Sequence, residues 1–218
     1  MSNESKKIKT VAIIAGGEKS ELRGIENADF IITCDKGYNY AAAAGITPDL
    51  YVGDGDSLFG RVSENIITLQ LPVEKNDTDL MAAVRCSLEK ILPENFIFYC
   101  AGGGRYDHFL GNLQAACYAA KRGAKVKIID LYADFYVFSG DESGKKEHTF
   151  YRRNGYSFSV LSLTDKCVGV RICGAKYEIE NAVITSDFPI GVSNEWKENE
   201  IKVSLKSGVL CVCMCKMR

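Results

Sequence analysis

The sequence lacks the features that would place it outside the ordinary globular class. Among its 218 residues only 4 are proline and 20 are glycine, which is too few for a low-complexity or disordered chain. Charge of one sign is not in excess, because 27 basic residues are balanced by 28 acidic ones and the formal net charge is -1. Without an overall cationic field, we expect no general binding to nucleic acid or to an anionic membrane.

Long hydrophobic runs are also missing. The N-terminal sequence MSNESKKIKT has no apolar core of a signal peptide, and no later run approaches the roughly 20 apolar residues of a membrane span. We therefore expect a cytoplasmic protein whose nine cysteines are reduced thiols. Cys211, Cys213 and Cys215 alternate along one predicted strand, a spacing that favours packing on one face over a zinc site built from CxxC turns.

Up to Asp130, short apolar runs alternate with helical patterns. The runs are rich in Ile, Val and Phe and predict buried strands at residues 11–15, 30–34, 50–52, 66–69, 96–100 and 126–129. Two stripes at helical spacing predict amphipathic helices, one with Leu80, Val84, Leu88 and Ile91 and one with Leu110, Leu113, Cys117 and Ala120. This alternation predicts an α/β domain with a mostly parallel sheet flanked by helices.

After Asp130 the pattern changes to short alternating segments separated by turn signals such as Asn154-Gly155 and Ser207-Gly208. No helical pattern stands out there, so we expect a small antiparallel β-sandwich domain. The polar stretch DESGKKEH favours a loop or linker, which places the boundary within residues 133–143. The predicted domains are residues 1–135 and 144–218.

Acidic residues follow several of the predicted strands. They are Asp35, Asp54, Asp56 and Asp130. Ligands of open α/β sheets bind at the carboxyl ends of the strands, so these carboxylates are placed to hold a metal such as Mg²⁺. The string Asp54-Gly55-Asp56-Ser57 is also typical of a plain turn, and alone it does not decide between the two.

A second cluster, Glu74-Lys75-Asn76-Asp77-Thr78-Asp79, opens the first predicted helix. Asp77 or Thr78 is suited to cap that helix. Capping needs only one or two of these residues, and Lys75 among acids is also typical of a cation that contacts phosphate beside a metal. Both interpretations stay open from the residues alone.

The third cluster, Gly102-Gly103-Gly104-Arg105, lies between a predicted strand and the second helix. Glycines let backbone amides approach an anion at a helix start, and Arg105 adds a forked donor for phosphate. The Walker and dinucleotide-binding patterns are absent, and Gly16-Gly17-Glu18-Lys19-Ser20 only approximates the former. We interpret His108 as a structural helix-start residue rather than a base. Together the three clusters predict a site for Mg²⁺ and a polyphosphate.

These clusters, in this order and followed by a β-domain, resemble the thiamine pyrophosphokinase (thiamine diphosphokinase) family over nearly the whole chain. Residues 48–57 match its P-D-x-x-x-G-D-x-D-S pattern, and residues 75–79 correspond to its K-D-x-T-D segment, with Asn76 in place of the first Asp. The most specific match is G-G-R-x-D-H-x-L-x-N, intact at residues 103–112. Residues 174–177 and 193–194 resemble the G-x-K-[YW] and S-N segments of its thiamine-binding domain.

Two residues depart from the family pattern. Asn76 stands where the family usually has Asp, so a metal or hydrogen-bonding role there weakens or passes to Asp77. Cys173 stands where many relatives carry Thr or Ser, which puts a hydroxyl contact to thiamine in doubt.

The resemblance implies transfer of the diphosphoryl group of ATP to the hydroxyl of thiamine, giving thiamine diphosphate and AMP. It implies Mg²⁺ held by Asp54, Asp56 and Asp79, with Lys75 and Arg105 neutralising the phosphates. The nucleotide-binding residues it implies are Asp35, Gly103, Gly104, Arg105 and Asn112. Asp107 is the candidate for orienting the Arg105 loop or the nucleophile. Phosphoryl transfer depends mainly on positioning and electrostatics, so no strong general base is expected.

The resemblance also implies a homodimer whose thiamine sites are shared between the catalytic domain of one subunit and the β-domain of the other. In that arrangement Tyr177 stacks on the thiamine pyrimidine, and Ser193 and Asn194 supply polar contacts. An aromatic face suits a flat cationic ligand, although a strand tyrosine is otherwise a packing residue.

Three other functions remain to be compared with this one. A nucleotide-sugar transferase accounts for Asp54 and Asp56, because its D-x-D motif holds a metal against a diphosphate, but it leaves residues 103–112 unexplained. A pyrophosphokinase for another primary alcohol, such as a hydroxymethylpterin, shares the ATP site and differs in the acceptor pocket. A nucleotide sensor binds Mg-ATP without turnover, and the retained acidic and basic site residues argue against it.

Overall fold

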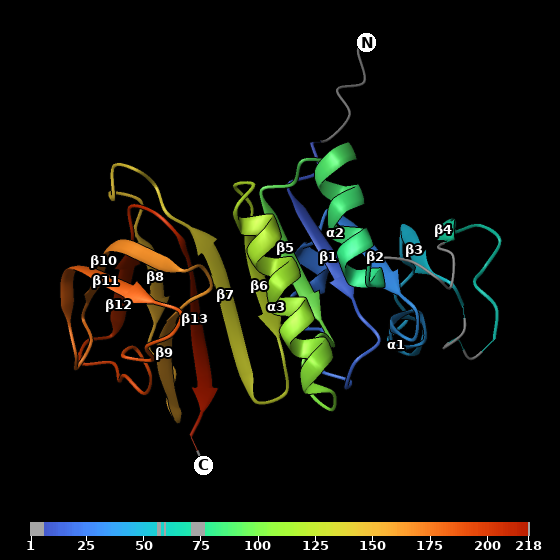
Figure 1. Ribbon diagram of the computed structural model, residues 1–218. Helices are drawn as coiled ribbons and strands as arrows, with labels where there is room; N and C mark the ends of the chain where they lie inside the picture. The colour runs from blue at the N-terminus through green and yellow to red at the C-terminus, as the bar shows by residue number, and fades with distance from the viewer. Residues whose placement is uncertain (1–6, 56–57, 59, 71–76, 218) are drawn as a thin grey trace, which may run out of the picture. The chain divides into compact units, whose positions relative to one another are not determined.

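The structure is a computed structural model that describes residues 7–55, 58, 60–70 and 77–217 (Figure 1). The chain divides into two compact units. The first unit contains Met1–Ala115 and Ile128–Leu131, and the second contains Ala116–Lys127 and Tyr132–Arg218. None of the helices in the described part of the chain has the length and apolar composition needed to cross a membrane.

The first unit is built on parallel strands. Their bounds are β1 (Thr10–Ile14), β2 (Phe30–Cys34), β3 (Leu50–Gly53), β4 (Ile67–Gln70) and β5 (Asn95–Tyr99). The later strand β6 (Lys125–Ile129) has residues in both units. The order β4-β3-β2-β1-β5 is parallel throughout, with Val11 of β1 beside Phe30 on one side and Phe96 on the other. The six strands predicted from apolar runs are confirmed, each within one residue at either end.

Helices follow four of these strands, namely β1, β2, β4 and β5. The helices are η1 (Ile25–Asn27), α1 (Gly37–Ala43), α2 (Asp79–Lys90) and α3 (Tyr106–Ala120). Both predicted helices are present, and the Oγ1 of Thr78 caps α2 by accepting a hydrogen bond of 3.2 Å from the amide of Met81. Helix α2 buries Leu80, Val84 and Leu88 and contacts β1, β2 and β3 (Figure 1). The seven-residue α1 was not predicted, because it is too short to display a helical period.

The strand order creates a topological switch point in the first unit. From β1 the chain moves outward through β2 and β3 to β4, and it then returns to place β5 on the opposite side of β1. The connections that follow β1 and β5 therefore run toward opposite edges of the sheet, an arrangement that creates a crevice at the carboxyl ends of these strands. A ligand site is expected at that crevice.

The second unit is an antiparallel β-sandwich, as predicted. Its strands are β7 (Ala133–Ser139), β8 (His148–Tyr151), β9 (Tyr156–Ser162), β10 (Lys166–Cys173), β11 (Ile179–Thr185), β12 (Glu200–Ser204) and β13 (Val209–Lys216). One sheet has the order β7-β13-β9 and the other β11-β10-β12-β8. Buried side chains from both sheets, including Phe158, Val170, Ile201 and Leu210, form one core.

The segment expected to contain the domain linker instead begins with a strand. β7 pairs with β13 along its whole length, with Val137 opposite Cys211. The residues of β7 are mostly apolar, and the polar stretch that suggested a linker starts only after Ser139. That stretch forms a turn in which the amide of Gly144 donates to the carbonyl of Asp141 at 2.6 Å.

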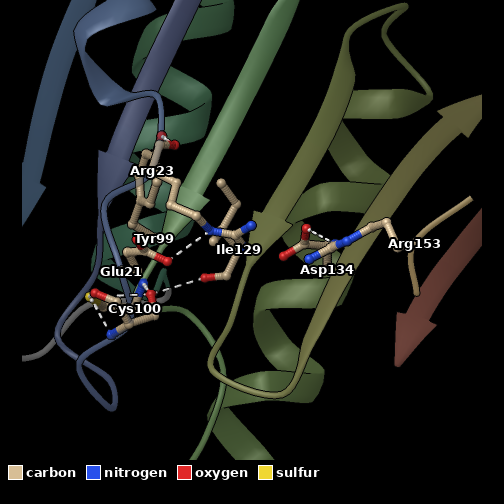
Figure 2. A network of polar contacts seen from close by, with 8 residues as sticks. Glu21, Arg23, Tyr99, Cys100, Ile129, Asp134 and Arg153 are labelled. Carbon is tan, nitrogen blue, oxygen red and sulfur yellow. Dashed lines mark hydrogen bonds and ion pairs between the residues drawn. The ribbon is translucent and has the colours of Figure 1, made fainter. Parts of the chain in front are cut away.

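A buried ion pair anchors β7 inside the second unit. Nη1 of Arg153 lies 2.6 Å from Oδ2 of Asp134, whose side chain is almost fully buried (Figure 2). Arg153 also packs over the ring of Tyr156. Removing one partner of such a pair leaves a buried charge without compensation, which is strongly destabilising.

The alternating cysteines lie on β13, as predicted. Cys211 and Cys213 are buried, and burial raises the pKa of Cys211 to about 12 and also raises the pKa of Cys213. The Sγ atoms of Cys213 and Cys215 lie 3.2 Å apart. Thiols with such raised pKa values stay protonated at neutral pH and act as small packing groups.

Candidate active site

A cleft of about 730 Å³ opens in the first unit at the predicted crevice. It lies beyond the carboxyl ends of β1, β2 and β5 and at the starts of α2 and α3. Its lining residues are Ala15 to Lys19, Cys34 to Lys36, Tyr40, Thr78 to Leu80, Ala101 to Arg105, Asp107, His108, Gly111 and Asn112. The starts of two helices at one cleft favour an anionic ligand.

The loops after β1 and β5 approach each other so closely that glycine is required. The amide of Gly17 donates to the carbonyl of Cys100 at 2.9 Å. A Cβ on Gly17 would lie 2.5 Å from that carbonyl oxygen, inside van der Waals contact. The hydroxyl of Tyr40 on α1 donates to the carbonyl of Gly17 at 2.9 Å and fixes this loop from a third segment.

The Gly-Gly-Gly-Arg loop follows β5 and leads into α3. Gly103 and Gly104 have φ of 66° and 61°, which L side chains rarely adopt. A Cβ on Gly103 would overlap the side chain of Glu18. Asn112, predicted as a nucleotide-binding residue, donates from Nδ2 to the carbonyl of Ala101 at 2.7 Å and so holds the start of this loop.

Asp130 lies against the same loop. A Cβ on Gly102 would lie 2.5 to 2.8 Å from the Asp130 carboxylate, so only glycine allows this contact. Oδ1 of Asp130 is buried and finds no hydrogen-bond donor among the described residues. The strand-end position of Asp130 therefore leaves an acceptor beside the cleft.

Tyr51 lies beside Asp35, an acid predicted for the nucleotide site. Asp35 follows β2, Asp54 follows β3, and Asp79 is the first residue of α2. Burial raises the pKa of Tyr51, and the negative charges of Asp35, Asp79 and Asp54 raise it further. A Cβ on Gly53 would overlap Oδ1 of Asp35, which explains glycine at the end of β3.

The donor chemistry of these acids fits Mg²⁺ bound together with a polyphosphate. Mg²⁺ uses one or two carboxylates and fills its other positions with waters and phosphate oxygens. In the described part of the chain, no group of three or more Asp, Glu, His or Cys side chains forms a metal site by itself. Asp56 and Lys75, which were predicted as a ligand and as a phosphate contact, lie outside the described residues.

The cations of the cleft come from three loops. Arg105 is exposed and makes a two-point ion pair with Asp107, which raises the pKa of Arg105 and lowers that of Asp107 to about 2. Lys19 and Lys36 also line the cleft, although neither was predicted as a site residue. Their position in the sequence could have indicated them, because Lys36 directly follows the strand-end acid Asp35 and Lys19 lies in the loop between β1 and η1.

The predicted thiamine contacts lie together in the second unit. The Tyr177 side chain is 61% exposed, with Nζ of Lys176 5.6 Å from its ring centroid. Asn194 is buried, and its Oδ1 accepts hydrogen bonds from the amides of Tyr177 at 3.1 Å and Glu195 at 2.9 Å. Its Nδ2 donates to the carbonyl of Tyr177 at 2.8 Å, so the Asn194 amide holds the backbone that presents the tyrosine ring.

Ser193 adopts a left-handed conformation with φ of 62° next to this anchor. Its amide donates to Oγ of Ser159 on β9 at 3.1 Å. Ser193 itself is exposed. Cys173, at the position where the sequence departs from the family pattern, is a partly buried free thiol at the end of β10.

The fold and the cleft define a class of protein in which an α/β unit, with a cleft at the carboxyl ends of its strands, is joined to a β-sandwich. Two family models match the chain: "Thiamin pyrophosphokinase, catalytic domain" over residues 23–128, and "Thiamin pyrophosphokinase, vitamin B1 binding domain" over residues 147–210. The chain belongs to the thiamine pyrophosphokinase family.

Relatives from bacteria and a fungus share this organisation over nearly their full length. The thiamine pyrophosphokinase of Bacillus subtilis (strain 168) is 30% identical over 214 residues, covering 93% of this chain and 97% of the relative. The crystal structure of thiamine pyrophosphokinase from Bacillus subtilis superposes with a TM-score of 0.80 at 27% identity, covering 95% of this chain and 99% of that one. Thiamin pyrophosphokinase from Candida albicans shares the fold at 13% identity, with a TM-score of 0.74 and coverage of 96% and 90%.

Proposed function

We propose that the protein transfers the diphosphoryl group of ATP to the hydroxyl of thiamine and releases thiamine diphosphate and AMP. The observation that carries this proposal is the cleft at the switch point, which the Gly-Gly-Gly-Arg loop lines together with Asp35 after β2 and Asp79 at the start of α2. Membership of the family over both units supports the same reaction. The transfer forms a bond between the thiamine oxygen and the β-phosphorus and breaks the bond between that phosphorus and the α,β-bridging oxygen.

The acids at the cleft are proposed to hold Mg²⁺ against the polyphosphate. Asp54 and Asp79 are the described members of this set, Asp56 is the third, and Asp35 lies on the same side of the sheet. Bound Mg²⁺ supplies charge neutralisation on the transferring phosphates. Because the proposed transition state is loose, the protein contributes mainly by position and electrostatics.

The remaining charge on the phosphates is proposed to be met by Arg105, Lys75 and the glycine loop. Gly103 and Gly104 have no side chains that would block their amides, and the start of α3 adds its dipole. Asp107 holds the guanidinium of Arg105 in one orientation while leaving it exposed at the cleft. A planar fork held in this way suits a phosphate better than a free cation does.

Thiamine is proposed to bind at the exposed ring of Tyr177, with Ser193 beside it. Lys176 is paired with Glu195 at 3.0 Å, which offsets its charge next to a cationic ligand. We propose a homodimer in which the cleft of one subunit and Tyr177 of the other complete each site. The proposed compartment is the cytoplasm, where nine free cysteines fit a reducing environment.

Isotope transfer tests the proposed reaction. The protein is incubated with thiamine, MgCl₂ and ATP labelled at the β-phosphorus, and the products are separated. We expect the label in thiamine diphosphate, AMP in equal amount, and little reaction with thiamine monophosphate, whose hydroxyl is already esterified. ADP in equal amount with thiamine monophosphate would instead identify an ordinary kinase, and ATP binding without any product would identify a nucleotide sensor.

Complementation between subunits tests the proposed shared site. At thiamine concentrations well below the raised KM of Tyr177→Ala, this variant and Asp54→Asn are each expected to show strongly reduced activity as homodimers. Mixing them under conditions of subunit exchange should restore part of the activity, because one heterodimer site keeps both native residues. Full activity in a protein shown by light scattering to be monomeric would contradict the shared site.

A further inference from the structure

Tyr51 buries a hydroxyl that the packing of β3 does not require. The residue is 2% exposed, and its Oη has no hydrogen-bond partner among the described residues. A purely apolar side chain would fill the same space, and its ring already packs edge-on against Tyr38 with centroids 6.1 Å apart. A buried hydroxyl without a partner costs stability comparable to a lost hydrogen bond, so its presence calls for a partner in another state of the protein.

The surroundings of the hydroxyl indicate what that partner is. Carboxylates of Asp35, Asp79 and Asp54, from three separate segments, all raise the pKa of Tyr51. A Cβ on Gly53 would overlap Oδ1 of Asp35 and would lie 2.7 Å from Oη of Tyr51, so both groups border the same small space. The hydroxyl therefore lies beside the Asp35 carboxylate and not in an apolar part of the core.

Tyr99 provides the contrast within the same sheet. Its side chain is also completely buried, but its hydroxyl donates to the carbonyl of Arg23 at 2.8 Å (Figure 2). Tyr99 thus has the structural hydrogen bond that a buried tyrosine ordinarily has. The two residues differ in that Tyr51 faces carboxylates of the proposed metal site and Tyr99 faces backbone.

We propose that Tyr51 is a positioning residue of the divalent-cation site, whose hydroxyl donates a hydrogen bond to the acid cluster when a cation gathers it. The inference rests on the proposed function, because it takes Asp54 and Asp79 as cation ligands. Groups that hydrogen-bond to metal ligands fix their orientation, and losing one typically weakens metal binding by about 10- to 100-fold. Tyr51 itself contacts neither substrate nor cation in this proposal.

Binding of Mn²⁺ alone tests the role without relying on catalysis. Free Mn²⁺ is measured by electron paramagnetic resonance during titration of the wild type, Tyr51→Phe and the matched control Tyr99→Phe. We expect the dissociation constant to rise about tenfold in Tyr51→Phe and to stay unchanged in Tyr99→Phe. In thermal unfolding without divalent cations, Tyr51→Phe should be at least as stable as the wild type, whereas Tyr99→Phe should unfold at a lower temperature.

The outcomes separate this inference from the proposed function. Wild-type affinity in Tyr51→Phe, or a loss of stability without cations like that of Tyr99→Phe, would overturn the positioning role. If Asp54→Asn still weakens Mn²⁺ binding in that experiment, the proposed metal site stands and only the role of Tyr51 is lost. Absence of Mn²⁺ binding by the wild type would overturn the positioning role, whereas the proposed reaction would still be decided by the isotope-transfer experiment.

Discussion

The guanidinium of Arg105 donates two hydrogen bonds to the carboxylate of Asp107, from Nη2 to Oδ2 at 2.6 Å and from Nε to Oδ1 at 3.2 Å. The side chains are 68% and 65% exposed, so the pair contributes little to stability. Both residues line the cleft at the start of α3. The pair therefore presents a guanidinium in a fixed orientation, and its contribution is expected in ligand binding.

Replacing Arg105 by lysine removes the two-point geometry of the guanidinium and keeps its positive charge, so the effects of geometry and charge can be separated. Arg105→Lys should lower kcat/KM for ATP by about tenfold or more, because an ammonium cannot bind phosphate at two points. Arg171→Lys is the matched control, since Arg171 also makes two carboxylate contacts but lies in the second unit. Equal kcat/KM values for Arg105→Lys and the wild type would show that only the charge matters.

The acids at the strand ends are predicted to be needed for turnover and not for folding. Asp54→Asn, Asp56→Asn and Asp79→Asn should each reduce kcat by about 10²-fold, because each removes a charged ligand that faces a polyanion. Circular dichroism should show a folded protein in every case. Asp141→Asn, in an exposed turn of the second unit, should retain full activity. Near-normal kcat in all three variants at saturating Mg²⁺ would contradict the metal-binding role of these acids and would show that they serve only the local backbone structure.

Tyr177 and Asn194 are predicted to affect thiamine and ATP differently. Tyr177→Ala should raise KM for thiamine much more than KM for ATP, because a stacking surface contributes about 0.5–2 kcal/mol and contacts only the acceptor. Tyr177→Phe, which keeps the ring, should stay close to the wild type. Asn194→Ala should raise the same KM and also lower Tm, since three hydrogen bonds to backbone are lost. An equal rise in both KM values for Tyr177→Ala would point to general damage of the β-sandwich.

His148 is predicted to make the second unit sensitive to acid. It stacks on Phe138 with ring centroids 3.7 Å apart, and burial, followed by the charges of Lys125 and Lys146, lowers its pKa from 6.5 to about 4. The unfolded chain therefore binds a proton in a range where the folded chain does not. Stability contributed by neutral His148 is complete above pH 6.5 and is lost as the pH falls toward 4.

Calorimetry between pH 6.5 and 4 checks whether the folded protein loses stability as the pH falls. The Tm of the wild type should fall by about 2–4 °C more between pH 6.5 and 4 than that of His148→Phe, allowing for partial exposure of the ring. The Phe variant keeps the stacked arrangement and removes the proton site. Parallel Tm curves for the two proteins would show that His148 does not control this transition.

Local patterns determined much of the molecule before folding was considered. Apolar runs placed the six strands of the first part of the chain, Thr78 marked the start of α2, and alternation predicted the sandwich. These features are readable because each depends on residues that are neighbours in sequence. The glycine loop at Gly103 was predicted for the same reason, since its backbone conformation requires the residue type.

Tertiary structure decided which of those residues meet, because their contacts join segments far apart in the chain. The strand order alone places the loop after β1 beside the loop after β5, where Gly17 bonds to Cys100. Asn194 was predicted from sequence as a thiamine contact, and only folding engages its amide with the backbone of Tyr177, 17 positions earlier. In the sequence Tyr51 is one residue of a predicted apolar strand. Its burial beside Asp35, with the charges of Asp54 and Asp79 also raising its pKa, exists only in the folded chain, because there the desolvated hydroxyl and the carboxylate share one low-dielectric space.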